Sequence, residues 1–405
     1  MTMNAQTATP VGDVPYLDIA DPAFAMESEE VRRARERSWY ARTNYGIAVL
    51  RYHEVAKLLK SPKLNQGSAR WPDHNGVHSG RFYDWWVKNL LVLEGEEHHR
   101  IRRLINPAFS PKTARSYEGR FQSLADELAA DMATRTASDF VHDFAEPYAT
   151  RVLCILLDIP QEEWPWIAQV GARIGLALGI HIAEDIDDID RAVDELYEYV
   201  DHLIEERREH PGDDTVSHLI SVTAQGDALS DEELRNAVVL MIFGGMDTTR
   251  NQLGLAMQSF IRQPDQWELL AEHPELAGNA VEEVIRTNPT TRWVTREANQ
   301  DFEFQGLEIP AGTTVHLFTQ TSGQDPEMYP DPQMDVTERH PPHFGFGGGK
   351  HHCLGNHVAR QDIAVALPAL ARRITDVRQA MGDEWLPDSG NYGPVTLPIS
   401  YRVRD

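Results

Sequence analysis

The pattern of apolar and polar positions divides the chain into a mixed beginning, a long helical middle and a shorter β-rich end. GIAVLRY (46–52) predicts a strand, HEVAKLLK (53–60) predicts a short helix, and residues 61–93 show no clear periodicity. Helical periodicity dominates from about 97 to 285. After it come strand-like runs, namely RWVTREA, FEFQGLEI closed by Gln305-Gly306, TTVHLFT and TLPISYRV. The pattern therefore predicts a mostly helical α+β fold, with a helix-rich body and a small β-rich portion.

A long central helix has a well-marked beginning. Ser230 and Glu233 form a capping box, and Leu229 can pack on Leu234 as a hydrophobic staple. A helix from Asp231 to about Phe260 would span roughly 45 Å at ~1.5 Å per residue, which is the width of a whole domain. We therefore expect this helix to cross the core.

The chain of 405 residues carries no linker, low-complexity tract or internal repeat. Residues 1–14 read as a flexible N-terminal arm, and residues 15–405 are expected to form a single domain. The arm lacks the basic and apolar regions of a signal peptide, and no apolar run reaches membrane-spanning length. We therefore expect a cytosolic protein.

Charge and cysteine content narrow the function classes. With 38 Lys+Arg against 63 Asp+Glu, the formal charge is −25, which argues against nucleic acid or an anionic membrane as the main partner. Only Cys154 and Cys353 are present, so neither a disulfide framework nor a zinc cluster is indicated. A functional cysteine would act through its own thiolate.

The sharpest local signal is HFGFGGGKHHCLGNHVARQDIAVAL (343–367). Four glycines precede Cys353, and an apolar-periodic helix starts just after it. Glycines let the backbone approach a flat ligand, and the start of a helix favours thiolate over thiol, so this sulfur is a candidate metal ligand. A buried, inert cysteine beside an anion-binding glycine loop is an equal alternative on loop chemistry alone.

Three further groups stand out, each with an ordinary alternative. Gly244-Gly245 followed by Asp247-Thr248 is unusual inside a long helix, although helix packing alone could require the glycines. Glu283 and Arg286 have the i,i+3 spacing of a common surface pair. His98 and Arg102 lie on one helical face, where both can reach one carboxylate.

One family pattern connects these groups. Phe346, Gly349, His351, Cys353 and Gly355 match the Phe-x-x-Gly-x-His/Arg-x-Cys-x-Gly signature of cytochromes P-450 position for position. From about residue 46 to 400 the chain resembles the bacterial-type haem-thiolate monooxygenases of this family. Ser322-Gly323-Gln324 departs from the family, where a small residue is often followed by Asn-Arg. This departure affects a local loop bond and leaves the chemistry intact.

The resemblance assigns roles to the groups above. Cys353 becomes the axial ligand of haem b, with Phe346 packed beside the sulfur, and a thiolate in this position favours O–O cleavage. Thr248 is expected to hydrogen-bond the bound oxygen and Asp247 to help deliver protons. Glu283 and Arg286 become a structural pair, with Arg339 as the candidate third member. The remaining cofactor-binding positions are His98, Arg102, Arg296, His351, Gly349, Gly355 and, in a locally opened helix, Gly244 and Gly245.

The resemblance also places an apolar substrate pocket above the haem. It should draw on the aromatic loop 71–91 and on the stretch 166–182. The individual residues expected there are Trp85, Trp86, Leu240, Phe243, Thr291, Val294 and Tyr392.

The implied activity is hydroxylation or epoxidation of an apolar small molecule, such as a terpenoid, steroid, macrolide or aromatic secondary metabolite. The reaction would use O2 and two external electrons, because the chain has no flavin, nicotinamide or iron-sulfur motif of its own. A ferredoxin and an NAD(P)H-dependent ferredoxin reductase are the expected donors. The cations expected to dock an acidic ferredoxin are Arg102, Arg103, Lys350, His351, His352 and Arg360, unless the propionates occupy some of them.

Two alternatives to this activity stay open. One is an enzyme of the same family with an atypical outcome, such as oxidative coupling, nitration or peroxygenation, where the Asp-Thr pair is often altered. The other is a non-catalytic haem sensor, which would need an output domain that this chain does not show.

Overall fold

The computed structural model describes residues 14–179, 182–223, 228–388 and 390–404. The expected N-terminal arm therefore falls almost wholly outside the described residues. The α-helices are α1 Glu29–Arg37, α2 Tyr52–Leu58, α3 Trp71–His74, α4 Arg81–Trp86, α5 Gly95–Ile105, α6 Pro111–Ser116, α7 Glu118–Met132, α8 Glu146–Leu157, α9 Trp164–Gly175, α10 Ile182–Glu209, α11 Thr215–Thr223, α12 Asp231–Arg262, α13 Pro264–Glu272, α14 Ala277–Thr287, α15 Thr319–Gly323 and α16 Asn356–Ala371.

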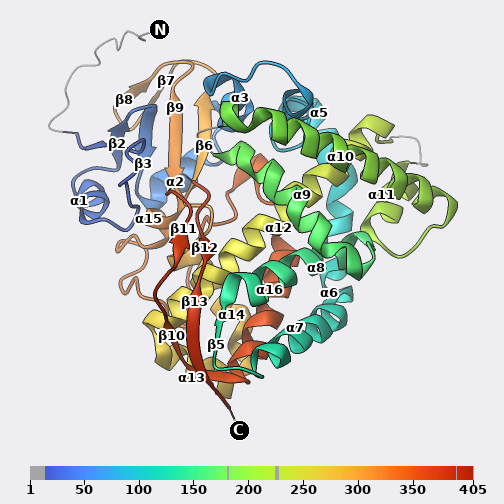
Figure 1. The fold of residues 1–405 in the computed structure, drawn as a ribbon. Coiled ribbons are helices and arrows are strands. Elements are labelled where there is room, and N and C mark those ends of the chain that lie inside the picture. Colours follow the sequence, from blue (N-terminus) through green and yellow to red (C-terminus); the bar gives the residue numbers. More distant parts are fainter. Residues whose placement is uncertain (1–13, 180–181, 224–227, 389, 405) are drawn as a thin grey trace.

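The strands form one larger sheet and three small ones. The larger sheet has the order β1-β2-β3-β9-β6-β4, and the others pair β10-β13-β5, β11-β12 and β7-β8. The strands are β1 Tyr16–Leu17, β2 Tyr40–Thr43, β3 Gly46–Val49, β4 Leu64–Gln66, β5 Ala137–Asp139, β6 Trp293–Ala298, β7 Phe302–Phe304, β8 Leu307–Ile309, β9 Thr314–Phe318, β10 Ile374–Gln379, β11 Glu384–Trp385, β12 Pro394–Thr396 and β13 Pro398–Val403. In Figure 1 the larger sheet lies beside the helical body, which confirms the helix-rich α+β expectation.

Local signals in the sequence are found where they were expected. The Ser230–Glu233 capping box is present at the start of α12, which runs to Arg262. Gln305 and Gly306 both have positive φ, as a two-residue hairpin turn between β7 and β8 requires. The stretch 61–93, for which no periodicity was found, contains the short elements β4, α3 and α4. Elements this short give too few repeats for a pattern to be recognised.

The helix α12 holds the helical body together. Its first half packs in a cluster with α9 and α10, through residues such as Val239 and Ile242. Its second half packs in another cluster with α8 and α14, through residues such as Leu253 and Phe260. Figure 1 shows α12 passing through the middle of this body. A residue in the middle of α12 therefore lies between the two clusters, deep inside the protein.

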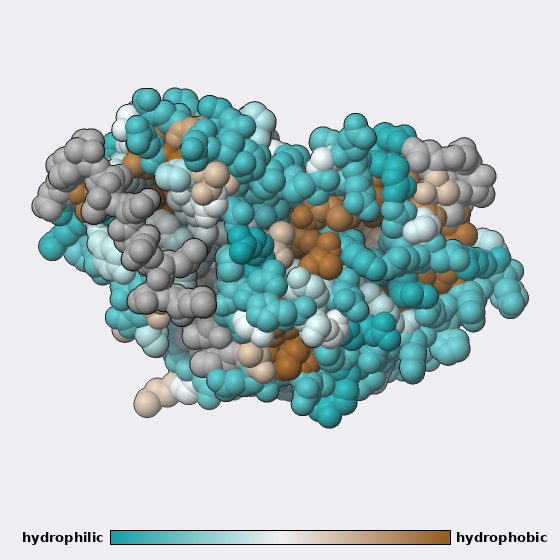
Figure 2. Space-filling view, turned by 90° about the horizontal axis from the view of Figure 1, so that it is seen from above, coloured by the Kyte–Doolittle hydropathy of each residue, from teal (hydrophilic) through white to brown (hydrophobic). Residues whose placement is uncertain are grey.

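The outer surface is mainly hydrophilic. Figure 2, which looks down from above Figure 1, shows apolar side chains gathered in a hollow between two raised parts of this face. Across the described ranges, no helix combines the length and the apolar character needed to cross a membrane. The cytosolic location stays a prediction.

Candidate functional site

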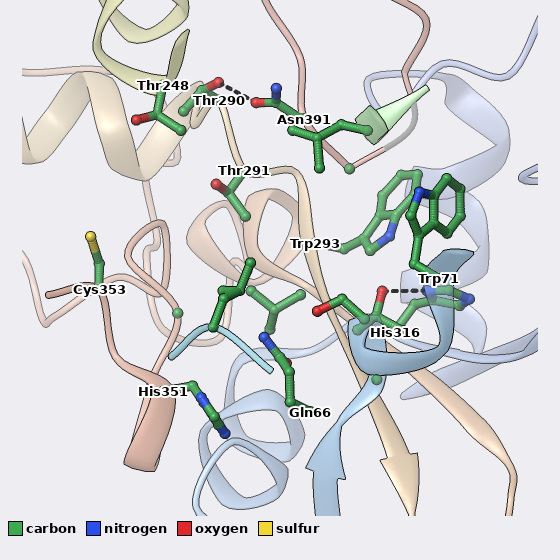
Figure 3. A pocket seen from close by; sticks show the side chains of 18 of the residues that line it. Gln66, Trp71, Thr248, Thr290, Thr291, Trp293, His316, His351, Cys353 and Asn391 are labelled. Atoms are coloured by element: carbon green, nitrogen blue, oxygen red, sulfur yellow. Dashed lines mark hydrogen bonds between the residues drawn. The ribbon is translucent and has the colours of Figure 1, made fainter. Parts of the chain in front are cut away.

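A large cavity, which also opens to the surface, lies between α12, the loop before α16, and the first half of β6. Its volume is about 2460 Å³, whereas a site for one small ligand commonly occupies roughly 300–1,000 Å³. Figure 3 shows Cys353 and Thr248 towards one side of this cavity and Trp71 and His316 towards the other. The cavity is therefore large enough for a prosthetic group and a second small molecule.

The loop that leads to Cys353 packs tightly against other segments of the protein. Gly349 has a φ of +68°, and a Cβ added there would stand 2.2 Å from the carbonyl oxygen of Leu59. A Cβ on Gly345 would stand 2.4 Å from Cγ2 of Ile285 on α14. Gly349 is not among the described residues that line the cavity, so its contribution is to the turn. The glycines fix where the loop ends, and hence where the cysteine stands.

Cys353 stands at the end of this loop, just before α16. Its N–H donates to the carbonyl oxygen of Phe346 at 2.9 Å, and Nδ2 of Asn356 donates to the carbonyl oxygen of Cys353 at 2.7 Å. Both bonds involve the backbone of Cys353, so they leave its side chain projecting into the cavity (Figure 3).

The surroundings of the sulfur act on its pKa in opposite directions. Burial raises the pKa of the Cys353 thiol, while the amides of Gly355 and Asn356 and the charges of Arg102 and Arg360 lower it. The balance is a raised pKa. A metal cation at the sulfur would reverse this balance, because a coordinating thiol is deprotonated.

Phe346 is held in place from the side of α16. The guanidinium carbon of Arg360 lies 4.3 Å from the centre of the Phe346 ring. Arg360 also donates through Nε to Oε1 of Glu282 at 2.5 Å and through Nη1 to Oδ1 of Asn356 at 2.8 Å. This arrangement restricts both the ring and the helix start that follows Cys353.

The four side chains expected to bind carboxylates lie near one another. The rings of His98 and His351 are 4.4 Å apart, and Arg102 and Arg296 influence the pKa of His98 and of His351, respectively. Burial, followed by the charges of His351 and Arg102, lowers the pKa of His98 to about 4. Burial also lowers the pKa of Arg296 to about 10. For each of these four groups, the negative charges nearby are too weak to offset the lowering of the pKa by burial.

Two observations in this region fit a ligand that carries hydrogen-bond acceptors and negative charge. Both ring nitrogens of His98 are buried without a hydrogen-bond partner, although the side chain is only 1% exposed. Arg296 is 4% exposed, and within the described residues it donates to two neutral groups, Oε1 of Gln66 at 2.5 Å and the carbonyl oxygen of Thr295 at 2.9 Å. Buried polar groups are normally satisfied and buried cations paired. A group with carboxylates, such as haem, fits the position of Arg296 in the cavity wall. His98 is not among the described residues that line the cavity and lies behind His351, with the two ring centres 4.4 Å apart.

Glu94 is a member of this region that the sequence analysis did not identify. It accepts from the Gln66 N–H at 2.6 Å and from Nε2 of His351 at 3.2 Å, and it forms an ion pair with Lys350. Burial alone would raise the pKa of Glu94, but the bonds from His351, Lys350 and Gln66 lower it to about 2. Nothing in the sequence signals this role, because the partners lie far away along the chain.

On the opposite wall, α12 presents Thr248 and Gly244. The Thr248 hydroxyl donates to the carbonyl oxygen of Gly244 at 2.7 Å. A Cβ on Gly244 would meet nothing within 4 Å, so helix packing does not explain this glycine. The expected local opening of the helix is not found, since α12 is continuous through this segment. The Thr248 side chain instead binds a carbonyl of the preceding turn.

Asp247 lies where α12 meets α9. Burial raises the pKa of this carboxyl, and the nearby charge of Arg250, whose Nη2 is 3.4 Å from Oδ1, acts against the rise. Oδ1 has no hydrogen bond. A Cβ on Gly175 of α9 would stand 2.7 Å from the other carboxylate oxygen, so the glycine leaves room for it. Asp247 is therefore a confined acid whose proton is held more firmly than usual.

Most of the side chains expected around the substrate line the cavity. They are Trp86, Leu240, Phe243, Thr291, Val294 and Tyr392, beside Gly244, Gly245, Arg102, Arg296, Phe346, His351 and Gly355.

The prediction for Trp85 is wrong. Its ring is 1% exposed and packs against Phe243 from behind, 5.3 Å between ring centres, because its position on α4 turns it to the core. Asn391, which the sequence analysis missed, reaches the cavity from the turn before Tyr392 and accepts from the Thr290 hydroxyl at 3.1 Å.

Glu283 and Arg286 form a buried pair with both side chains about 1–2% exposed. Arg286 also donates to the carbonyl oxygens of Gly323 and Gln333, both at 2.8 Å. The expected third member, Arg339, is exposed, whereas Nε2 of its neighbour His340 lies 3.7 Å from Oε2 of Glu283. The prediction of Arg339 is therefore wrong by one position. In an irregular loop the direction of the backbone decides which of two adjacent side chains points at Glu283, and the sequence does not reveal that direction.

Several cations of the expected basic patch already have partners within the protein. Lys350 is bound to Glu94, Arg360 to Glu282, and Arg102 to the carbonyl oxygen of His352. These cations stabilise the loop and the cavity floor rather than standing free.

Comparisons with known proteins agree with this site. The family model described as Cytochrome P450 matches residues 178–398. Luteothin monooxygenase from Streptomyces thioluteus is 36% identical and is aligned over 99% of both chains. Mycinamicin IV hydroxylase/epoxidase from Micromonospora griseorubida is 31% identical, over 98% of this chain and 100% of the relative. The crystal structure of CalO2 has a TM-score of 0.84 at 28% identity, covering 94% of this chain and 99% of that one.

A haem cofactor and monooxygenase activity follow from the family. The chain belongs to the cytochrome P450 family.

Proposed function

We propose that Cys353 ligates the iron of haem b and that the enzyme hydroxylates or epoxidises an apolar secondary metabolite. The observation that carries this proposal is that Cys353, Thr248 and Arg296, a buried cation whose hydrogen bonds go to neutral groups, line one cavity. The bound haem would supply the activation of dioxygen and the transfer of one oxygen atom to carbon.

The protein's own groups would bind and orient the cofactor. Arg296, Arg102, His98 and His351 would bind its propionates, which would give the single N–H of the neutral His98 ring an acceptor. Phe346, fixed by Arg360, would pack beside the Cys353 sulfur and keep water from it. We also propose that Gly244 leaves space for dioxygen beside Thr248, since nothing lies within 4 Å of a Cβ there.

Thr248 and Asp247 would deliver protons to the reacting oxygen. The Thr248 hydroxyl can move its donation from the Gly244 carbonyl to an oxygen in the cavity. The raised pKa of Asp247 lets this carboxyl keep a proton at a higher pH than an exposed aspartate does. An intact acid-alcohol pair favours hydroxylation or epoxidation over coupling, nitration or peroxide-driven chemistry.

The relatives support the substrate class. One is named a luteothin monooxygenase and another a mycinamicin IV hydroxylase/epoxidase. A further relative, from Mycobacterium tuberculosis and 29% identical, is named a steroid C26-monooxygenase. The cavity wall around Trp86, Leu240 and Phe243 suits an apolar molecule of this size.

Electrons would come from a ferredoxin and its NAD(P)H-dependent reductase. Because Lys350 and Arg360 are paired, the docking cations would include the exposed Lys112 and Arg115 of α6, near His357 of α16. Reduction by an acidic ferredoxin should slow several-fold between ~0.05 and ~0.5 M salt, because salt screens attraction between exposed charges. Stopped-flow measurement of haem reduction tests this, and a rate independent of salt would contradict it.

The loop geometry gives a prediction on haem binding. Gly349→Ala places a Cβ against the Leu59 carbonyl at a strained φ, so it should destabilise the protein by about 1–3 kcal/mol and lower the haem bound per chain. Absorbance at the Soret band relative to protein measures the haem content. The matched control is Gly119→Ala in α7, where φ is not positive and nothing lies within 4 Å of the new Cβ. Equal haem content in both variants would show that this turn does not hold the cofactor.

The proton-delivery role gives a prediction on coupling. Thr248→Ala should leave NADH consumption but lower product per NADH about tenfold or more, because a positioned proton donor is lost. Product and hydrogen peroxide are measured per NADH, with a compound chosen by its low-to-high spin shift of the ferric haem. Thr248→Ser keeps the hydroxyl and should stay coupled. Unchanged coupling in the alanine variant would remove this role from Thr248.

A further inference from the structure

The cavity continues beyond the cysteine side, around the edge of β6. In the register of the larger sheet, β4 pairs only with Arg296–Ala298, so Trp293–Thr295 is paired on the β9 side alone. Val294 faces the cysteine loop, since its Cγ1 lies 3.7 Å from a Cβ built on Gly347. Trp293 and Thr295, its neighbours along the strand, face the other side of the sheet. The cavity passes this unpaired edge and reaches both faces.

We call the part on the far face the outer lobe, and the part around Cys353, Thr248 and Val294 the inner lobe. Figure 3 shows Trp71, Trp293 and His316 well away from Cys353 and Thr248 across the same cavity. The outer lobe is lined by Ile19, Phe24, Trp71, His74, Asn75, Trp293, Thr295 and His316.

His316 lines the cavity and carries a buried polar atom without a hydrogen-bond partner. The residue is 6% exposed, and its Nε2 is buried without a hydrogen-bond partner. Its Nδ1 lies 3.3 Å from the Thr295 hydroxyl. When that hydroxyl donates to Nδ1, the ring hydrogen resides on Nε2 and needs an acceptor. Burial lowers the pKa of His316 to about 4, so the ring is neutral near pH 7 and does not attract an anion.

The aromatic walls of the outer lobe are fixed. Nε1 of Trp71 donates to the carbonyl oxygen of Ala177 at 2.8 Å. Trp293 stacks on Phe318, with ring centres 5.5 Å apart and 22° between the planes, and meets the edge of Phe24 at 6.4 Å. Rings held in this way favour a flat, aromatic or conjugated group over a flexible chain.

We propose that the outer lobe is a second substrate subsite, which binds an uncharged aromatic or conjugated end group through an oxygen acceptor hydrogen-bonded to Nε2 of His316. The opposite end of the same elongated substrate lies in the inner lobe and is oxidised there. This inference rests on the proposed function, since the inner lobe must hold the haem.

Imidazoles that coordinate the ferric haem test this proposal without knowledge of the natural substrate. The probes are 1-(ω-arylalkyl)imidazoles with linkers of increasing length, each ending in phenyl or 4-acetylphenyl, and the Soret shift on titration gives the dissociation constant. Affinity should pass through a maximum at one linker length, where the aryl group reaches the outer lobe. At that length the acetyl oxygen should tighten binding about fivefold, as expected for one hydrogen bond.

Substitutions at His316 and Trp71 separate the contribution of the hydrogen bond from that of the aromatic wall. His316→Leu should abolish the acetyl gain and leave the phenyl series unchanged, whereas His316→Gln should keep part of the gain. Trp71→Leu, a second and independent variant, should flatten the dependence on linker length. The control His142→Leu changes a histidine whose side chain is 57% exposed, in the π-helical stretch Val141–Ala145 before α8, and this variant should bind every probe as the parent does.

Two results would overturn the proposal. Affinity independent of linker length would mean that the outer lobe is only a passage, and an acetyl gain that persists in His316→Leu would mean that another group binds the oxygen. Failure of 1-benzylimidazole, the shortest probe, to shift the parent's Soret band would instead contradict the haem assignment. The experiment can therefore contradict the proposed subsite without contradicting the proposed function, and the reverse.

Discussion

The proposed coordination between the Cys353 sulfur and a haem iron is the interaction on which the function of this protein depends. Burial raises the pKa of the thiol, and the surrounding amides and arginines do not fully offset the rise. Under this proposal, thiolate formation and cofactor binding would occur together, because the metal would supply the missing positive charge. Arg296 in the cavity wall has a related need for negative charge, because it is buried and its hydrogen bonds go to neutral groups. His98 beside it is neutral near pH 7 and lacks only hydrogen-bond partners.

The rest of the fold keeps this bond in a confined space. The glycine loop sets the position of the sulfur against α2 and α14, and α12 brings Thr248 and Asp247 to the opposite wall. The larger sheet contributes through the short pairing of β4, which leaves half of β6 open. One strand edge thus connects an inner lobe suited to chemistry with an outer lobe suited to recognition. Loop length and strand register, rather than additional catalytic groups, would then set which molecules fit.

The sequence predicted features whose signals are local. The capping box of α12, the hairpin turn at Gln305 and the loop around Cys353 each depend on a few adjacent residues. Trp85 was misplaced because neighbouring positions on a helix point in directions about 100° apart, and only the packing of α4 shows that Trp86 is the one facing the cavity. Glu94 and His316 were missed because their surroundings come from distant segments.

The most direct measurement is the spectrum of the reduced protein under carbon monoxide, compared between the parent, Cys353→Ser and Cys154→Ser. Cys154 is the matched control, since it is buried and burial raises the pKa of its thiol to about 12. A sulfur ligand at position 353 predicts a red-shifted Soret band in the parent and in Cys154→Ser, and its loss in Cys353→Ser. A Cys353→Ser protein that keeps the parent's band would contradict the account.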